Sequence, residues 1–192
     1  MKTATVKIWR TEDDGSGGAY VEYSVPWADG ETALGALMHI YDDQDASLAF
    51  RYGCRFQACG LCGVRVSGED RLACRTPLEN GQTIEPMHHL PVIRDLVVDR
   101  RGLLDDLRDL ALHADPEAEL DLPAWRKTNR ADKYYNTCNC VECLCCHSMC
   151  DEAGENGHRG AFALVKLAQM HHHAANNRDR AAQAMEAGLE AC

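Results

Sequence analysis

Cysteines are the residues of this chain that could do chemistry: the 192 residues contain eleven, and all but the last fall into two clusters. The first cluster has the spacing C-x4-C-x2-C followed by a later fourth cysteine, formed by Cys54, Cys59, Cys62 and Cys74. Plant-type 2Fe–2S centres use this spacing, in which one loop supplies three thiolates and a later segment supplies the fourth. Zinc also accepts four thiolates, but zinc ribbons favour C-x2-C pairs far apart in the sequence. The first cluster therefore predicts a 2Fe–2S site.

The second cluster places six cysteines within thirteen residues, more than one tetrahedral zinc ion can use. Four of them have the spacing C-x2-C-x2-C-x3-C that holds 4Fe–4S clusters, namely Cys140, Cys143, Cys146 and Cys150. In two-cluster ferredoxins the fourth cysteine of such a run binds a different cluster, so we expect Cys150 to serve a second centre. Cys138 and Cys145 are then left over, and we expect them to be small packed thiols. Two signatures in one short chain indicate a relay for electrons.

Composition narrows the class of protein. Acidic residues outnumber basic ones by 30 to 20, and the net charge of -10 argues against a nucleic-acid surface. That charge suits docking to a basic patch on a partner, and plain solubility explains it equally well. No stretch approaches the roughly 18 apolar residues that a membrane-spanning helix requires, and the N-terminus has no apolar signal region. We expect a cytoplasmic, reducing location; the alternative, a disulfide framework, would need an oxidising one.

The elements that must position the first cluster read as a mixed sheet with one helix. Residues 3–10 and 19–25 alternate with the period of a half-buried hairpin. Thr32 can cap a helix, whose apolar positions are Leu34, Leu37, Met38 and Tyr41. After the cysteine loop, further strands are predicted at 63–68 and 82–85. Two strands, a crossing helix and returning strands predict a β-grasp sheet with the metal loop at its edge.

Glycines Gly53, Gly60 and Gly63 flank the cysteines of the first loop. Glycine reaches positive φ without steric cost, and backbone N–H groups must turn toward inorganic sulfide to tune its charge. We therefore expect these three residues to supply the positive φ values of the loop.

The pattern changes from strand to helix after Pro91. One apolar helical face runs through Leu103, Leu107, Leu110 and Ala111. Residues 114–127 carry prolines and alternating acids and read as an extended connector. Helices are predicted again at 162–168 and 178–191. The fold class is therefore α+β, a β-grasp 2Fe–2S domain followed by an all-helical domain. The expected ranges are residues 1–105, a connector at 106–130, and residues 131–192.

Several motifs in order resemble those of the iron–sulfur subunit of succinate dehydrogenases and fumarate reductases. The resemblance covers nearly the whole chain. The motifs that carry it lie at residues 48–54, 72–74, 91–99, 140–150 and 188–192. The resemblance implies a β-grasp ferredoxin domain, a helical ferredoxin domain, and the role of electron-transfer subunit in an oxidoreductase complex, with no catalytic residue in this chain. It implies as partners a FAD-bearing subunit that oxidises succinate or reduces fumarate, and a quinone-binding membrane anchor. The chain would then lie peripherally on the inner face of the cytoplasmic membrane.

The resemblance also implies the ligand sets. Carried over by position, Cys54, Cys59, Cys62 and Cys74 would hold the 2Fe–2S centre nearest the flavin. Cys140, Cys143 and Cys146 would supply three corners of a 4Fe–4S centre. Cys150 and Cys192 would belong to a 3Fe–4S centre nearest the quinone. The family uses two further cysteines, one for each of these last two clusters, so we expect the sequence to be a fragment of a longer reading frame.

One departure from the family concerns the quinone. A proline follows the fourth cysteine of the run in the family, whereas Asp151 follows Cys150 here. This replacement keeps open a relative with a different electron partner, such as a thiol-linked or otherwise soluble fumarate reductase, or the same module serving another flavoprotein. From a different class, a zinc-stabilised scaffold without a redox role is the alternative.

Overall fold

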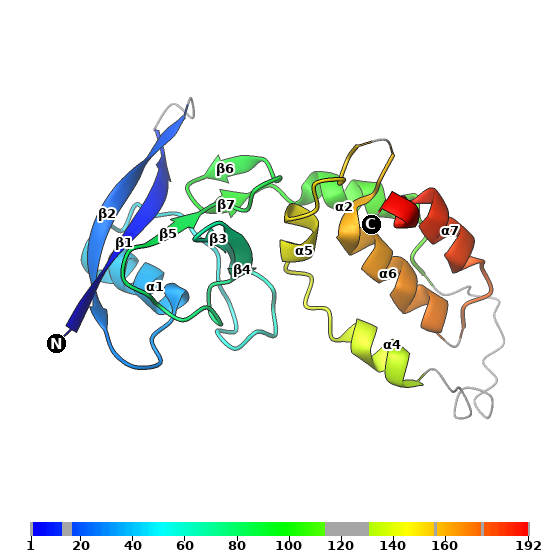
Figure 1. Cartoon of the computed structure of the whole chain (residues 1–192), viewed down its shortest axis with the longest axis horizontal. Helices are drawn as coiled ribbons and strands as arrows, with labels where there is room; N and C mark the ends of the chain where they lie inside the picture. Colours follow the sequence, from blue (N-terminus) through cyan, green and yellow to red (C-terminus); the bar gives the residue numbers. More distant parts are fainter. Residues whose placement is uncertain (1, 13–16, 114–130, 156, 174, 192) are drawn as a thin grey trace. The chain divides into compact units, whose positions relative to one another are not determined.

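The computed structural model describes residues 2–12, 17–113, 131–155, 157–173 and 175–191. The chain forms two compact units, described separately below. Unit 1 comprises Met1–Arg100 and Val141–Met149, and unit 2 comprises Arg101–Cys140 and Cys150–Cys192. All strands belong to unit 1, and the described elements of unit 2 are helical (Figure 1), so the predicted α+β class is confirmed. The predicted domain ranges stay predictions, and residues 114–130 of the predicted connector lie outside the described residues.

A five-stranded sheet in the order β2-β1-β5-β3-β4 forms the centre of unit 1. Its strands are β1 (Lys2–Thr11), β2 (Gly18–Trp27), β3 (Gly63–Val66), β4 (Glu69–Leu72) and β5 (Gln82–Glu85). β1 pairs with β2 in an antiparallel hairpin and with β5 in parallel, whereas β3 is antiparallel to both of its neighbours. The predicted β-grasp arrangement is therefore confirmed.

The core of unit 1 follows from the alternation of β1 and the apolar face of one helix. Ala4, Val6 and Ile8 on alternate positions of β1 are buried. Helix α1 (Ala33–Asp43) begins after Thr32, whose side-chain oxygen accepts a hydrogen bond from the Gly35 N–H at 3.2 Å, as the sequence predicts. The buried face of α1 consists of Ala33, Leu34, Ala36, Leu37 and Ile40.

The predicted apolar face of α1 needs one correction. Tyr41 was expected to be buried on this face but is 45% exposed, and the neighbouring Ile40 is fully buried instead. The helix packs through the stripe that includes Leu37 and Ile40, three residues apart, so Tyr41 lies at the rim of the apolar face.

A small hairpin after Pro91 differs from the expected change to helix at this point. It consists of β6 (Val92–Arg94) and β7 (Val97–Val98), which pair antiparallel with an irregular register. Asp95 forms its turn with a φ of +46°. Strands this short carry too few residues for an alternation to be visible in the sequence.

The segment Val141–Met149 belongs to unit 1 although it lies far along the chain. It contains the one-turn helix α5 (Cys145–Ser148). The Asp70 N–H donates to the Met149 sulfur at 3.3 Å, and the His89 N–H donates to the Ser148 hydroxyl at 3.4 Å. Half of the second cysteine cluster is therefore held against the sheet domain.

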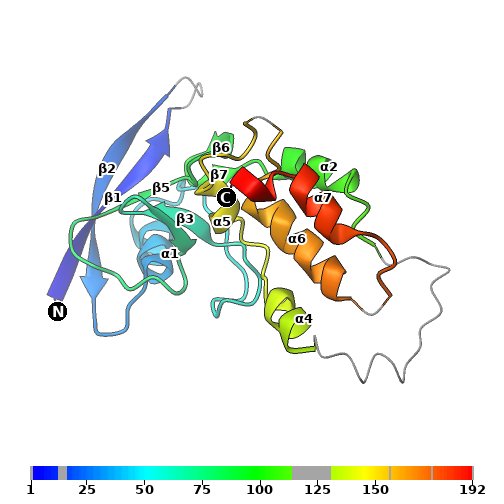
Figure 2. The ribbon, with the colours of Figure 1, turned by 45° about the vertical axis from the view of Figure 1, so that its right-hand side comes forward.

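Unit 2 is built from the short helices α2 (Arg101–Arg108), α4 (Ala131–Cys138), α6 (Gly160–His172) and α7 (Arg180–Glu186), and a 3-10 turn at Leu189–Ala191. α2, α6 and α7 lie side by side in both views (Figures 1 and 2). Their core includes Leu110, Ala163, Leu167 and Ala187. The helix predicted at 162–168 is confirmed, and that predicted at 178–191 is divided into α7 and the final turn. Within the described residues, no helix has the length and apolarity needed to cross a membrane.

Candidate iron–sulfur site

The first cysteine loop connects α1 to β3 and directs backbone N–H groups at its own sulfur atoms. The Cys54 sulfur accepts hydrogen bonds from the N–H groups of Phe56 at 3.4 Å and Ala58 at 3.1 Å. The Cys59 sulfur accepts one from the Cys54 N–H at 3.4 Å. These bonds lower the pKa of the Cys54 thiol to about 7, with the Phe56 N–H as the largest cause. The loop therefore stabilises negative charge on sulfur, as a metal-binding thiolate requires.

The positive φ values of this loop come mainly from residues that the sequence did not single out. Arg55 and Gln57 both have a φ of +66°, an uncommon conformation for residues with a Cβ. Among the three flanking glycines, only Gly60 has a positive φ, also +66°, so the expectation for Gly53 and Gly63 was wrong.

Gly53 and Gly63 lie in tightly packed places instead. A Cβ on Gly53 would lie 3.3 Å from the Cys59 sulfur. A Cβ on Gly63 would lie 3.0 Å from the Cys143 carbonyl oxygen and 3.1 Å from the Met87 sulfur. The sequence shows that glycines flank the cysteines. Only the packing shows whether a glycine supplies a positive φ or leaves room for a close neighbour.

Cys62 and Cys74 are brought together by the β3–β4 hairpin. Cys62 directly precedes β3, Cys74 follows β4, and the Ala73 N–H donates to the Cys62 carbonyl at 2.9 Å. Both thiols are buried and they hydrogen-bond to each other. Burial raises the pKa of the Cys62 thiol to about 11.

The four predicted cysteines of the first cluster therefore lie as two pairs, Cys54 with Cys59 and Cys62 with Cys74. Among the described residues, no three His, Cys, Asp or Glu side chains are placed to bind a single metal ion. A 2Fe–2S cluster has two irons and four thiolates, so two pairs of thiols are the donor set it needs. No disulfide joins the described cysteines. The residues present fit this cluster better than they fit one zinc ion.

The second cysteine run is divided between the units. Cys143, Cys145 and Cys146 belong to unit 1, whereas Cys138, Cys140 and Cys150 belong to unit 2. Cys192 lies outside the described residues. The stated roles of these residues as cluster ligands stay predictions.

Cys143 is flanked by two residues with positive φ, Glu142 at +56° and Leu144 at +68°. This repeats the arrangement around Phe56 in the first loop. The Cys143 thiol interacts with that of Cys145, which the spacing of the run leaves without a role. This hydrogen bond lowers the pKa of Cys143 to about 6, and the same bond raises the pKa of Cys145. The two thiols therefore influence each other's protonation.

The two cysteine loops meet backbone to backbone at Gly60. A Cβ at Gly60 would overlap the Val141 carbonyl oxygen and lie 2.9 Å from the Cys143 nitrogen. Only a residue without a side chain permits this approach. In unit 1, the first loop and the start of the second run are therefore in direct contact.

Arg100 is a further residue of this region that sequence reasoning missed. Its two terminal nitrogens lie 3.5 and 3.4 Å from the Gly60 carbonyl oxygen, to which they donate. The residues are 40 positions apart, so no local pattern reveals the contact. Only the folded structure shows that this basic side chain lies near the cysteine loops.

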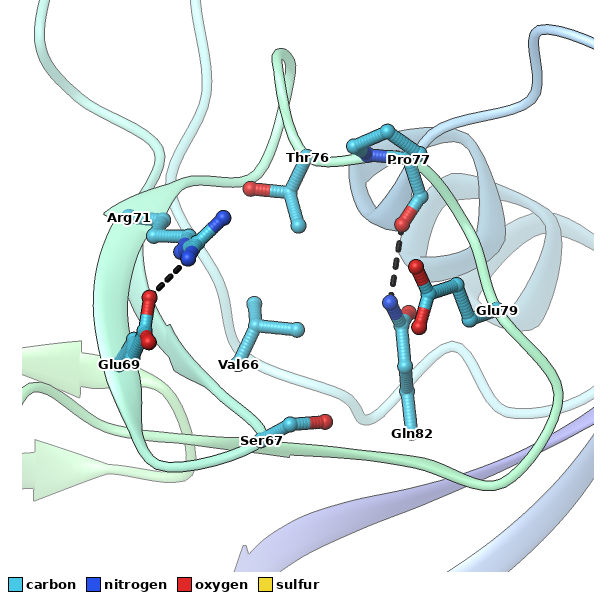
Figure 3. A pocket seen from close by; sticks show the side chains of 8 residues that line it. All are labelled: Val66, Ser67, Glu69, Arg71, Thr76, Pro77, Glu79 and Gln82. Atoms are coloured by element: carbon cyan, nitrogen blue, oxygen red, sulfur yellow. Dashed lines mark hydrogen bonds and ion pairs between the residues drawn. The ribbon is translucent and has the colours of Figure 1, made fainter.

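A polar cavity of about 200 Å³ lies elsewhere in unit 1, between the β3–β4 hairpin and the segment leading into β5 (Figure 3). Its polar groups bond largely to one another: Arg71 pairs with Glu69, and the Gln82 amide donates to the Pro77 carbonyl at 2.9 Å. Among its described lining residues there is no cysteine or histidine. We assign it no part in the cluster site.

Comparison with known proteins agrees with the cysteine chemistry. Residues 5–105 match a family described as the 2Fe-2S iron-sulfur cluster binding domain. A fumarate reductase (CoM/CoB) subunit of Methanothermobacter marburgensis is 33% identical, over 97% of this chain and 38% of its own length. The fumarate reductase iron-sulfur subunit of Haemophilus influenzae is 31% identical, over 82% of this chain and 67% of its own length. The chain thus spans about two fifths of the first relative.

A solved structure is also similar over nearly the whole chain. It is described as the Mycobacterium smegmatis Sdh1 complex in the apo form, with a TM-score of 0.85 and 27% identity. The similarity covers 99% of this chain and 83% of that one. Because both units, the family match and two named relatives agree, the chain belongs to the family of iron–sulfur subunits of succinate dehydrogenases and fumarate reductases.

Proposed function

We propose that this chain relays electrons within a succinate dehydrogenase or fumarate reductase complex, between a FAD-bearing catalytic subunit and a quinone or another acceptor or donor. The observation that carries the proposal is the first cysteine cluster, whose four thiols lie as two pairs, with backbone N–H groups aimed at the sulfur atoms of Cys54 and Cys59. In this proposal the complex lies on the inner face of the cytoplasmic membrane, to which its partner subunits attach it.

In this proposal Cys54 and Cys59 hold one iron of a 2Fe–2S cluster, and Cys62 and Cys74 hold the other. The bound cluster supplies one-electron transfer, which no side chain of this chain provides. The N–H groups of Phe56, Ala58 and Cys54 stabilise negative charge on the sulfur atoms. The carbon atoms of succinate or fumarate react on the partner subunit.

The second run completes the proposed relay. Cys140, Cys143 and Cys146 have the spacing of ligands to a 4Fe–4S cluster, and Cys150 and Cys192 are assigned to a 3Fe–4S cluster. The contact of Gly60 with Val141 and Cys143 supports this order, since these residues of the second run lie beside the first loop. Short steps between centres are what a relay requires.

A second candidate is the iron–sulfur subunit of a thiol-linked fumarate reductase. Two observations favour it: the similarity to the methanogen CoM/CoB fumarate reductase extends over 97% of this chain, and Asp151 follows Cys150. The two candidates differ in their electron partner. A purified complex that reduces fumarate with thiols and not with a quinol would be of the second kind, and the reverse would identify the first.

Anaerobic purification of the full-length protein with its co-purifying subunits tests the proposed chemistry. We expect iron, acid-labile sulfide and a paramagnetic resonance signal of a 2Fe–2S centre after reduction with dithionite. Cys54→Ala should abolish that signal and remove about two iron atoms per chain, because one iron loses a thiolate. Cys138→Ala is the matched control and should keep both. A colourless protein that contains zinc would identify the scaffold alternative and end the redox proposal.

A further inference from the structure

Arg100 carries a positive charge into the contact between the two cysteine loops of unit 1. Its guanidinium donates to the Gly60 carbonyl through both terminal nitrogens. Gly60 is also the residue that the Val141 carbonyl and the Cys143 nitrogen approach. The guanidinium is close enough to the thiols of Cys62 and Cys143 for each to favour its charged form.

One donor of the Arg100 guanidinium is buried without a partner. Its buried Nε–H has no hydrogen-bond acceptor among the described residues. The basic side chain of Arg51 repels it. A half-buried cation with an unused donor is costly unless an anionic group lies nearby. The sulfur atoms of the two cysteine loops, once deprotonated to bind a cluster, would supply such anionic groups.

We propose that Arg100 is a positioning residue that raises the reduction potential of the 2Fe–2S centre and of the centre that Cys143 binds. The inference rests on the proposed function, and it adds a residue outside both cysteine motifs. Its charge acts through space, so it needs no bond to iron.

The physical reason is electrostatic. Four thiolates and bridging sulfides make a cluster site anionic, and reduction adds one electron with no bond broken and no proton moved. A fixed positive charge at the edge of the site favours the form with the extra electron. In a medium of effective dielectric constant about 20, a unit charge about 12 Å away has about a tenfold effect on the ratio of reduced to oxidised centre. For a one-electron couple, tenfold corresponds to about 59 mV.

Redox titration of the assembled protein, followed by paramagnetic resonance, tests the inference. Arg100→Gln should lower the reduction potentials of the 2Fe–2S centre and of the centre that Cys143 binds. At a fixed applied potential, the ratio of reduced to oxidised centre should fall about tenfold in each. Arg100→Lys keeps the charge and should stay near the wild-type potential. Arg94→Gln is the matched control: its side chain is 56% exposed in the same region of the chain, so it should change neither centre.

Unchanged potentials in Arg100→Gln would overturn the role of Arg100, and so would equal shifts in Arg100→Gln and Arg100→Lys, which would indicate shape rather than charge. If Arg100→Gln binds no clusters, Arg100→His asks the same question within one folded protein. Its potentials should fall more steeply than those of the wild type as the pH rises through the histidine pKa, and an equal slope would overturn the inference. A wild-type protein without iron–sulfur signals would instead overturn the proposed function.

Discussion

Asp95 is a buried carboxylate that joins its own hairpin to two other segments of unit 1. Its side chain is 1% exposed. It accepts hydrogen bonds from the Ala49 N–H at 2.8 Å and the Thr11 N–H at 2.9 Å, and it lies 3.2 Å from Arg10 Nε. Ala49 leads directly into the first cysteine loop, so this carboxylate fixes the start of the loop to the end of β1.

The protonation of Asp95 gives a pH dependence with a definite sign. Burial by itself raises its pKa, but the two N–H groups and the Arg10 guanidinium outweigh it and hold the pKa below its ordinary value. The stabilisation is therefore fully present above the unfolded-state pKa of about 3.9 and is lost as the pH falls through the folded-state pKa. Asp95→Asn should unfold more easily at pH 7 by about 2 kcal/mol, because one charged partner of Arg10 is removed.

Chemical denaturation followed by the fluorescence of Trp9 and Trp27 measures this effect. The stability curves of the wild type and Asp95→Asn should converge as the pH is lowered below about 4. Asp29→Asn alters an exposed carboxyl group and should follow the wild type at every pH. Parallel curves for the wild type and Asp95→Asn would show that the carboxylate charge is not what stabilises the fold.

At the scale of residues, the sequence predicted the cysteines and missed their neighbours. Ligands recur at fixed short intervals, so spacing identifies them. Asp95 bonds to Thr11 across 84 positions, and Arg100 bonds to Gly60 across 40. Such partners leave no local pattern.

At the scale of elements, the buried side chain of Arg180 in α7 binds the segment that follows α2. Arg180 is 1% exposed and donates to the carbonyls of Leu110 at 3.0 Å, Ala111 at 3.0 Å and His113 at 3.3 Å. Its Nε also donates to the Asn176 amide oxygen at 3.0 Å. These carbonyls follow the C-terminus of α2, where backbone acceptors lack helical partners and a cation is favoured. Burial lowers the pKa of this guanidinium, so its bonds must offset the cost of burying the charge.

Arg180→Met should therefore destabilise unit 2 by about 3 kcal/mol, since it leaves buried carbonyls without donors. Hydrogen exchange read by mass spectrometry should show a loss of protection in residues 101–108 and 180–186, roughly a hundredfold for the amides that open by global unfolding of the unit. Arg178→Met removes an exposed arginine two residues away and should leave the protection unchanged. Equal protection in Arg180→Met and the wild type would refute the capping role.

Periodicity predicted the elements that are long enough to show it. The β1–β2 hairpin, α1 with its Thr32 cap, and α6 were all foreseen, because ten or more residues repeat one pattern in each. The four-residue strands β3 and β5 were also foreseen. The hairpin of β6 and β7 and the single turn of α5 were not. Their two to four residues are ordered by tertiary hydrogen bonds, such as that from His89 to Ser148, rather than by local preference.

At the scale of the whole molecule, unit 1 is assembled from segments that are distant in the chain, and Gly60 is where they meet. Gly60 and Gly68 both have positive φ, at +66° and +88°. A Cβ at Gly68 would meet nothing within 4 Å, whereas one at Gly60 would overlap the Val141 backbone. Alanine at Gly68 would test the free-energy cost of the backbone conformation alone. Alanine at Gly60 would add the cost of displacing the Val141 backbone.

Gly68→Ala should cost about 1 kcal/mol from its φ alone and leave residues 141–149 protected from hydrogen exchange. Gly60→Ala should cost more, expose residues 141–149 to exchange and reduce the iron content of the purified protein. The same exchange and iron content in both variants would show that the contact with Val141 is not needed to hold the second run.

The chain by itself determined the kind of chemistry and the fold class, because cysteine spacing, strand alternation and helix capping are all encoded within a few consecutive residues. Only the tertiary structure decided that four thiols lie as two pairs, that Arg55 and Gln57 rather than two of the glycines take positive φ, and that Val141–Met149 belongs with the sheet. It also placed Arg100 against the first loop. These outcomes depend on hydrogen bonds and close contacts between residues tens of positions apart, which form only when the chain has folded.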